Sequence, residues 1–322
     1  MGSDLYAGLQ SVLAPAGPQA DRIYALWWLF AIVCIGVWIA VAVALYLALW
    51  RRGRQTLPER PHGEPRKVRV VAAATALTVL VLFVFVGASA LAGRAMSAQP
   101  DANARPVIVE VVGHQWWWEV RYPDEIASRG FTTANEIRIP VGRPIIVRAS
   151  SRDVIHSFWV PNLHGKIDLI PGRTNTIWLQ ADRPGEYRGQ CAEFCGLQHA
   201  KMALVVIAED DLAFETWAEA QRQPAAGPTD PVALRGQEVF LGAQCSLCHT
   251  IRGTNAYARV APDLTHIASR RTLGAGTLRN TRGNLAGWIV DPQHVKPGNF
   301  MPPTNLAGDD LQALLAYLEG LR

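Results

Sequence analysis

The hydrophobic positions of the chain are concentrated in its first hundred residues. Residues 23–50 contain no charged side chain, and residues 70–93 form a second uncharged run. Each run exceeds the roughly 20 residues that an α-helix needs to cross a bilayer. The pattern therefore predicts a membrane protein whose N-terminal part, residues 1–99, folds as a hairpin of two transmembrane helices over about 23–50 and 70–93.

The loop between the two runs indicates how the hairpin is oriented. Basic side chains gather there and at the start of the second run, namely Arg51, Arg52, Arg54, Arg60, Arg66, Lys67 and Arg69. Because positively charged loops stay in the cytoplasm, we expect both termini on the periplasmic side of a bacterial-type inner membrane. A cleaved signal peptide is the rival interpretation, but the first run is too long and is followed by arginine rather than by small residues.

From residue 106 to about residue 207 the pattern changes to short segments rich in Val, Ile and Thr, separated by Pro-Gly turns. Such segments are typical of strands. The predicted strands are 107–112, 136–140, 144–149, 174–179 and 202–207. A small antiparallel barrel or sandwich is the fold that this pattern favours, in a domain over residues 100–222.

The last part of the chain is a separate domain. Residues 223–231 are rich in Pro and Ala and are predicted to form a linker. Residues 232–322 follow, and they end in a predicted helix over 309–321. Asp309 and Asp310 would lie at the positive end of its helix dipole, where acidic side chains are favoured.

The distribution of charge and the number of cysteines argue against a nucleic-acid-binding protein and against a disulfide scaffold. Residues 101–223 carry 13 basic and 16 acidic side chains, whereas residues 231–322 carry 9 basic and 6 acidic ones. Basic clusters of the kind that bind nucleic acid are absent from this sequence. The opposite signs of the two soluble domains favour docking between them. Five cysteines are few for a disulfide scaffold, so we expect the paired ones to hold cofactors.

Four soft ligands lie within twelve residues, at Cys191, Cys195, His199 and Met202. Thiolate, imidazole and thioether favour copper over hard cations. An earlier histidine, His156, follows a predicted strand and would complete a site between strand ends. A disulfide between the cysteines, a zinc site with His199, and a packing role for His156 or Met202 are the alternatives at this point.

The segments around these residues resemble the copper-A domain of cytochrome c oxidase subunit II. The matching segments are 113–118, 153–161, 167–173 and 191–202. The resemblance extends from about residue 20 to residue 215, over both predicted helices and the β domain. It implies a cupredoxin-like β-barrel that is anchored by the hairpin and carries copper.

The resemblance further implies a binuclear centre of two copper ions. Cys191 and Cys195 would bridge both ions through sulfur, so that one electron is shared and little rearrangement accompanies a redox change. Each ion would be completed by one imidazole and one further donor: His156 with Met202, and His199 with the backbone carbonyl of Glu193.

Two more roles follow from the resemblance. The carboxylate of Glu193 would bind a Mg²⁺ or Mn²⁺ ion shared with subunit I, since hard ions prefer oxygen. Trp116 would receive the electrons that reach copper, although a run of three tryptophans on a strand has packing as its alternative. Many family members carry an acidic residue at the start of the second helix, near a proton entry; Glu64 is the nearest one here, and it departs from that pattern because a proline and a basic cluster follow it.

A second cofactor motif lies in the C-terminal domain. Cys245, Cys248 and His249 form the Cys-x-x-Cys-His pattern of covalent c-type haem attachment, with His249 as an axial ligand of the iron. Taken alone, the motif has a redox dithiol or half of a zinc site as alternatives. We expect two other histidines of this domain, His266 and His294, to be exposed and not ligands.

Residues 296–303, Lys-Pro-Gly-Asn-Phe-Met-Pro-Pro, resemble the distal-ligand loop of class I cytochromes c. This resemblance covers about residues 232–322 and implies an all-α cytochrome c domain with one haem c. Met301 would be the second axial ligand, which raises the haem potential. Pro262 would brace the proximal histidine, and Trp288 would approach a haem propionate.

Together the resemblances imply an electron-transfer subunit of a haem-copper terminal oxidase. Cytochrome c or another high-potential donor would supply electrons to haem c, copper A would pass them to subunit I, and O2 would be reduced to water with proton pumping. Subunit III would be a further partner, and the two N-terminal helices would contact the lipid bilayer. The alternatives are the copper-A subunit of a nitric oxide reductase and a membrane-anchored electron carrier without a catalytic partner.

Overall fold

The computed structural model describes residues 10–52, 64–98, 100 and 104–322. They form two units, a helical one over residues 21–98 and a soluble one made of the remaining residues. The centre of the predicted cytoplasmic loop, with Arg54 and Arg60, lies outside the described residues, and so does the side chain of Glu64.

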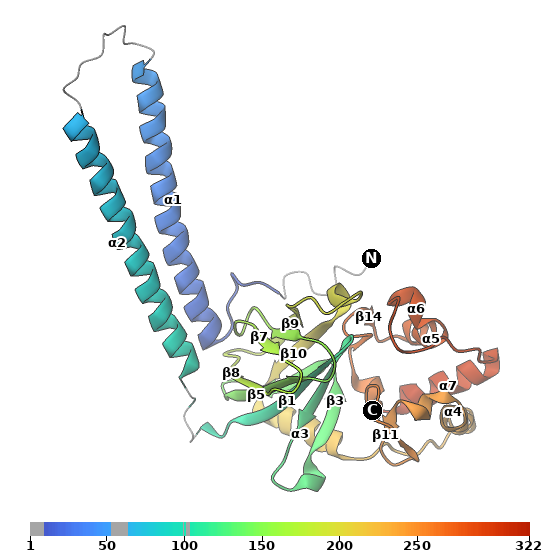
Figure 1. The fold of residues 1–322 in the computed structure, drawn as a ribbon. Coiled ribbons are helices and arrows are strands. Elements are labelled where there is room, and N and C mark those ends of the chain that lie inside the picture. Colours follow the sequence, from blue (N-terminus) through green and yellow to red (C-terminus); the bar gives the residue numbers. More distant parts are fainter. Residues whose placement is uncertain (1–9, 53–63, 99, 101–103) are drawn as a thin grey trace. The chain divides into compact units, whose positions relative to one another are not determined.

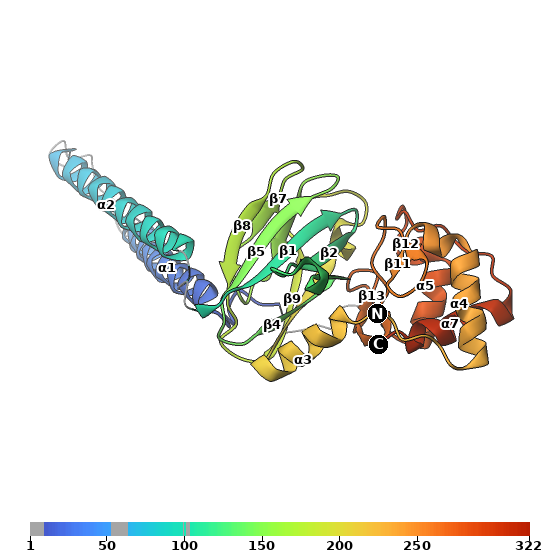
Figure 2. The ribbon, with the colours of Figure 1, turned by 90° about the horizontal axis from the view of Figure 1, so that it is seen from below.

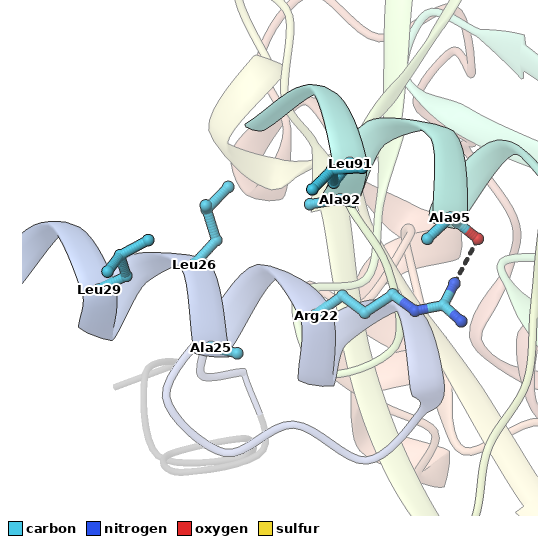
Figure 3. A pocket seen from close by; sticks show the side chains of 7 residues that line it. All are labelled: Arg22, Ala25, Leu26, Leu29, Leu91, Ala92 and Ala95. Atoms are coloured by element: carbon cyan, nitrogen blue, oxygen red, sulfur yellow. Dashed lines mark hydrogen bonds between the residues drawn. The ribbon is translucent and has the colours of Figure 1, made fainter. Parts of the chain in front are cut away.

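The helical unit is a hairpin of α1 (Pro18–Arg52) and α2 (Glu64–Ser97), which lie side by side in Figure 1. Both are long and apolar enough to span a membrane. The rings of Phe30 and Phe85 meet at 4.2 Å between centroids. The guanidinium of Arg22 donates to the carbonyl of Ala95 (Figure 3). Apolar side chains point outward along both helices, as a lipid environment favours.

The β domain is a sandwich of two five-stranded sheets, ordered β3-β2-β1-β5-β8 and β4-β10-β9-β6-β7 (Figure 2). The strands are β1 (Val107–His114), β2 (Trp117–Tyr122), β3 (Phe131–Ala134), β4 (Glu136–Pro140), β5 (Ile145–Ser151), β6 (His156–Trp159), β7 (Ile167–Leu169), β8 (Asn175–Leu179), β9 (Gly185–Cys191) and β10 (Ala203–Glu209). The purely antiparallel arrangement expected from the sequence is wrong at two pairings. Strands β1 and β5, and likewise β4 and β10, run parallel because their connections cross between the sheets.

The core of the sandwich lies between the two sheets. Alternate residues of β1, such as Val109 and Val111, are fully buried, and Trp118 of β2 packs edge-on against Phe158 of β6. Alternation of this kind places one face of each strand in the core. Helix α3 (Asp211–Arg222) then closes one end of the domain, and its N-terminus is capped by the carboxylate of Asp210.

The C-terminal domain is built from α4 (Pro231–Gly242), α5 (Arg282–Val290), α6 (Pro292–Val295) and α7 (Gly308–Gly320). Two short hairpins join them: β11 (Thr250–Ile251) with β12 (Ala256–Tyr257), and β13 (Thr272–Leu273) with β14 (Leu278–Arg279). Helices α4 and α7 cross so closely that a Cβ atom on Gly236 would lie 2.0 Å from the carbonyl oxygen of Ala313. The expectation that His266 is exposed is wrong, because its Nδ1 bonds the carbonyl of Arg322 at 2.6 Å in the interior.

Candidate functional site

The register of three strands brings the predicted copper ligands together. Strand β9 ends at Cys191, and β10 begins directly after Met202, so the ligand loop connects two neighbouring strands. The amide of Cys191 donates to the carbonyl of Met202 at 2.9 Å and closes the base of the loop. Strand β6 pairs with β9 and begins at His156, which places this distant histidine beside the loop.

The donor atoms of the predicted copper ligands converge on one buried spot. Both thiols are free, and their sulfur atoms lie 3.7 Å apart. The other close pairs are Cys191 Sγ with His156 Nδ1 at 3.8 Å, Cys191 Sγ with the Glu193 carbonyl at 3.2 Å, Cys195 Sγ with His199 Nδ1 at 3.6 Å, and Cys195 Sγ with Met202 Sδ at 3.8 Å. At such separations the donors are not covalently linked and are close enough to share metal ions, so the residues present fit a copper centre.

The pKa values of the two cysteines are shifted in opposite directions. The hydrogen bond from the Cys195 thiol lowers the pKa of Cys191 to about 3, and the bond with His156 acts in the same direction. The same contact raises the pKa of Cys195. Copper binding to both cysteines would release any proton that they carry, because metal ligation requires thiolates.

Asp153 orients the His156 imidazole and is a functional residue that the sequence did not single out. Its carboxylate meets His156 Nε2 at 2.8 Å and also accepts from the amides of Gln115 and Val154. The opposite ring nitrogen of His156 is thereby turned toward Cys191, and partners of this kind fix metal-binding imidazoles. A Cβ atom on Gly113 would lie 2.6 Å from the ring, so only glycine permits this approach.

The three consecutive tryptophans have three different surroundings. Trp116 precedes β2, is buried, and donates from Nε1 to the carbonyl of Cys195 at 2.9 Å. Trp117 stacks on His114 at 4.2 Å, and Trp118 lies in the sandwich core. Trp116 is therefore the member of the triplet that touches the ligand loop.

The carboxylate of Glu193 is partly exposed to solvent. It faces Lys166 at 3.5 Å, and its side chain is 45% exposed. The ion shared with subunit I stays a prediction, and in the described structure Lys166 is the partner of this carboxylate.

The predicted haem ligands lie on the turn after α4. Cys245 belongs to the 3₁₀ turn Gln244–Leu247, and the amides of Cys248 and His249 both donate to its carbonyl. The Nδ1 atom of His249 bonds the Pro262 carbonyl at 2.7 Å, which leaves Nε2 for iron. Burial lowers the pKa of His249 and keeps the imidazole neutral, as metal ligation requires. The free thiols and the braced, neutral histidine fit covalent haem c.

Met301 belongs to an ordered loop after α6. Its amide donates to Asn299 Oδ1 at 2.9 Å, and its carbonyl accepts from Gln293 at 2.9 Å. Trp288 lies in α5, and its ring packs against Gly274 of the hairpin between β13 and β14. The assignment of Met301 and Trp288 to the haem site stays a prediction.

Comparison with known proteins accounts for both soluble domains. The family described as "Cytochrome C oxidase subunit II, periplasmic domain" matches residues 125–209, and the family "Cytochrome c" matches residues 233–322. Cytochrome c oxidase subunit 2 of Alkalihalophilus pseudofirmus is 37% identical over 327 residues, which cover 97% of this chain and 91% of that relative. The chain belongs to the cytochrome c oxidase subunit 2 family.

Other subunit 2 proteins are similar to all or part of the chain. Cytochrome c oxidase subunit 2 of Bacillus subtilis is 29% identical over 97% of this chain and 92% of its own length. Among solved structures, the periplasmic domain of subunit II (CoxB) of Bradyrhizobium japonicum is 32% identical, covers 39% of this chain and 97% of its own, and has a TM-score of 0.35. The protein is thus a membrane-anchored subunit of a haem-copper terminal oxidase, an oxidoreductase complex.

Proposed function

We propose that this subunit holds a binuclear copper centre on the loop between β9 and β10 and one haem c in its C-terminal domain. The observation that carries the proposal is the convergence of two free thiols, two imidazoles, a thioether and a carbonyl on one buried spot. Residue by residue the ligands are His156, Cys191, Glu193 through its carbonyl, Cys195, His199 and Met202 for copper, and Cys245, Cys248, His249 and Met301 for haem.

When bound, both groups accept and release single electrons, so the subunit would connect a donor such as cytochrome c to subunit I. The contribution of the protein is to hold the ligands of both groups in place. Asp153 holds His156 in place, and Pro262 holds His249, so neither ligand needs to move between oxidation states. Trp116 is our candidate for the residue through which electrons reach the copper side, since its indole bonds the Cys195 carbonyl directly.

The finer partner assignments belong to the same proposal. Glu193 would share a Mg²⁺ or Mn²⁺ ion with subunit I, and subunit III would complete a proton-pumping complex in a bacterial-type inner membrane. The soluble domains would face the periplasmic side, where a high-potential cytochrome c can dock.

Purification of the intact complex tests the cofactor proposal. We expect two copper ions and one covalent haem c for each copy of this chain, together with O2 consumption when reduced cytochrome c is supplied. One zinc ion in place of copper would refute the ligand assignment. Turnover of nitric oxide with no O2 consumption would instead favour the reductase alternative.

The orientation of the hairpin is tested by reporter fusions. A reporter inserted at Gly63 should be active in the cytoplasm, and one placed after Arg322 should be active outside it, because the arginine-rich loop stays inside. Reporters that respond on the same side would rule out the hairpin orientation.

A further inference from the structure

The C-terminal domain is docked on the β domain through hydrogen bonds from several parts of both. Each domain contributes both backbone and side-chain groups to these bonds. The bonds between the two domains include those of Lys296 Nζ to the Trp116 and Lys201 carbonyls, Ala203 N to the Ala275 carbonyl, Arg271 N and Thr272 N to Glu136 Oε1, Gln198 Nε2 to the Pro297 carbonyl, Lys201 Nζ to the Val295 carbonyl, and the Arg252 guanidinium to the Gln221 and Arg222 carbonyls.

Lys296 is the most deeply buried charged residue of this contact, with 2% of its surface exposed. Its ammonium donates to three carbonyl oxygens, those of Trp116 at 2.8 Å, Lys201 at 2.9 Å and Gly274 at 3.1 Å. An ammonium has three N–H groups and accepts no hydrogen bond. All three donors are therefore used, and two of the three acceptors belong to the β domain.

A lysine in this position is satisfied only when the domains are together. Burial lowers the pKa of Lys296 to about 7, and the charge of Lys201 acts in the same direction. Water therefore solvates this ammonium poorly, and the carbonyls must replace it. If the domains part, the ammonium loses the Trp116 and Lys201 carbonyls and keeps only that of Gly274. All three bonds therefore form together only in this docked arrangement.

Net charge contributes less to docking than the opposite signs of the two domains suggest. Among the described residues one ion pair crosses the contact, from Arg271 to Glu186, and the side chains of both residues are at least 31% exposed. Exposed pairs of this kind add little stability. The other contacts pair a backbone group with a backbone or side-chain group and are not ion pairs, as in the bonds of Ala203 with Ala275 and of Lys296 with Trp116, so salt screens them weakly.

Docking also fixes two aromatic rings relative to each other. Phe300 immediately precedes Met301, and its ring lies parallel to that of Trp116, 6.4 Å between centroids and 8° from coplanar. Trp116 in turn bonds the carbonyl of Cys195. The loop that carries Lys296 thus places a neighbour of the predicted haem ligand over the ring that touches the copper loop.

We propose that Lys296 is an interdomain latch. By this we mean a positioning residue that holds residues 292–301 of the C-terminal domain against the Trp116 face, the part of the β domain formed by Trp116 and Lys201. The occupant of that face is this segment of the same chain. An external donor protein would therefore meet the C-terminal domain and not Trp116. This proposal stands on the docked contacts and does not depend on which metal the cysteines bind.

Amide hydrogen exchange of the assembled oxidase tests the latch. The amides of Ala203, Arg271 and Thr272 donate only across the contact in the described structure, so their exchange reports separation of the domains. In Lys296→Met, which keeps the length of the apolar stem, we expect these amides to exchange at least ~10-fold faster, as the loss of hydrogen bonds to a charged group implies. The amides within β9 and β10 beyond Ala203, and the copper and haem spectra, should be unchanged.

Arg235→Met is the matched control, because it removes one cation from the same domain at an exposed pair with Asp310 inside that domain. It should leave the three reporter amides unchanged. Unchanged exchange in Lys296→Met would overturn the latch. Equal acceleration inside the β sandwich, or an altered haem spectrum, would show a local structural role instead. If Lys296→Met does not assemble, Lys296→Arg serves the same test, since a planar guanidinium cannot direct three donors at these carbonyls.

Discussion

Replacing Cys195 with serine will remove the copper pair from an otherwise folded subunit. Its sulfur lies within 3.8 Å of the donor atoms of Cys191, His199 and Met202, so it contacts three other predicted ligands. A serine hydroxyl has similar size but is not a soft ligand. We expect the near-infrared absorption and the multi-line EPR signal of a mixed-valence pair to disappear. O2 consumption with reduced cytochrome c should fall by more than ~100-fold, beyond the effect typical of losing an outer partner of a metal ligand.

The chain contains its own control for this experiment. Cys34 lies in α1 as a free, exposed thiol far along the sequence from the ligand loop, and Cys34→Ser should leave both signals intact. Met202→Leu should be milder than Cys195→Ser, because a thioether tunes the potential of a copper site more than it holds the metal. A Cys195→Ser subunit that retains the near-infrared absorption would contradict the bridging role.

The ligand loop could be predicted from the sequence because its chemistry is local. Cys191 and Met202 are the ends of a twelve-residue segment, so their spacing is visible without any knowledge of pairing. The same holds for Cys245, Cys248 and His249. His156 is a weaker prediction from the residues alone, with a packing role as its alternative, because it approaches Cys191 through the pairing of β6 with β9 and not through local spacing.

Strand pairings and contacts between residues far apart in the chain could not be predicted from the sequence. The parallel pairing of β1 with β5 leaves no local signal, and the short strands β6 and β7 lack a clear alternation. Lys296 looks like one more residue of a cytochrome loop, because its acceptor Trp116 lies 180 positions away. His266 was expected at the surface for the same reason, since the carbonyl that covers it belongs to the C-terminal Arg322.

Replacing His249 with alanine should block electron flow through the C-terminal domain while the copper signals persist. Cys245 and Cys248 would still attach the haem covalently, but the iron would lose its proximal imidazole. The Pro262 carbonyl would also lose its partner, at a cost of about 1–3 kcal/mol in the free energy of unfolding. We expect an altered haem spectrum and a lower melting temperature of this domain. Haem-to-copper electron transfer, followed by flash photolysis, should slow by more than ~100-fold, because the haem potential depends on its axial ligands.

Two companion variants separate ligation from folding in that experiment. His294 is an exposed histidine of the same domain, and His294→Ala should preserve the haem spectrum, the melting temperature and the rate. Met301→Leu keeps the volume of the side chain and the two backbone bonds that fix its loop, so it should leave the melting temperature nearly unchanged. Loss of the thioether should nevertheless lower the haem potential, since His/Met ligation is what raises it. A Met301→Leu domain with an unchanged potential would place the second axial ligand elsewhere, whereas a loss of the copper signals in His249→Ala would mean that the two sites do not fold independently.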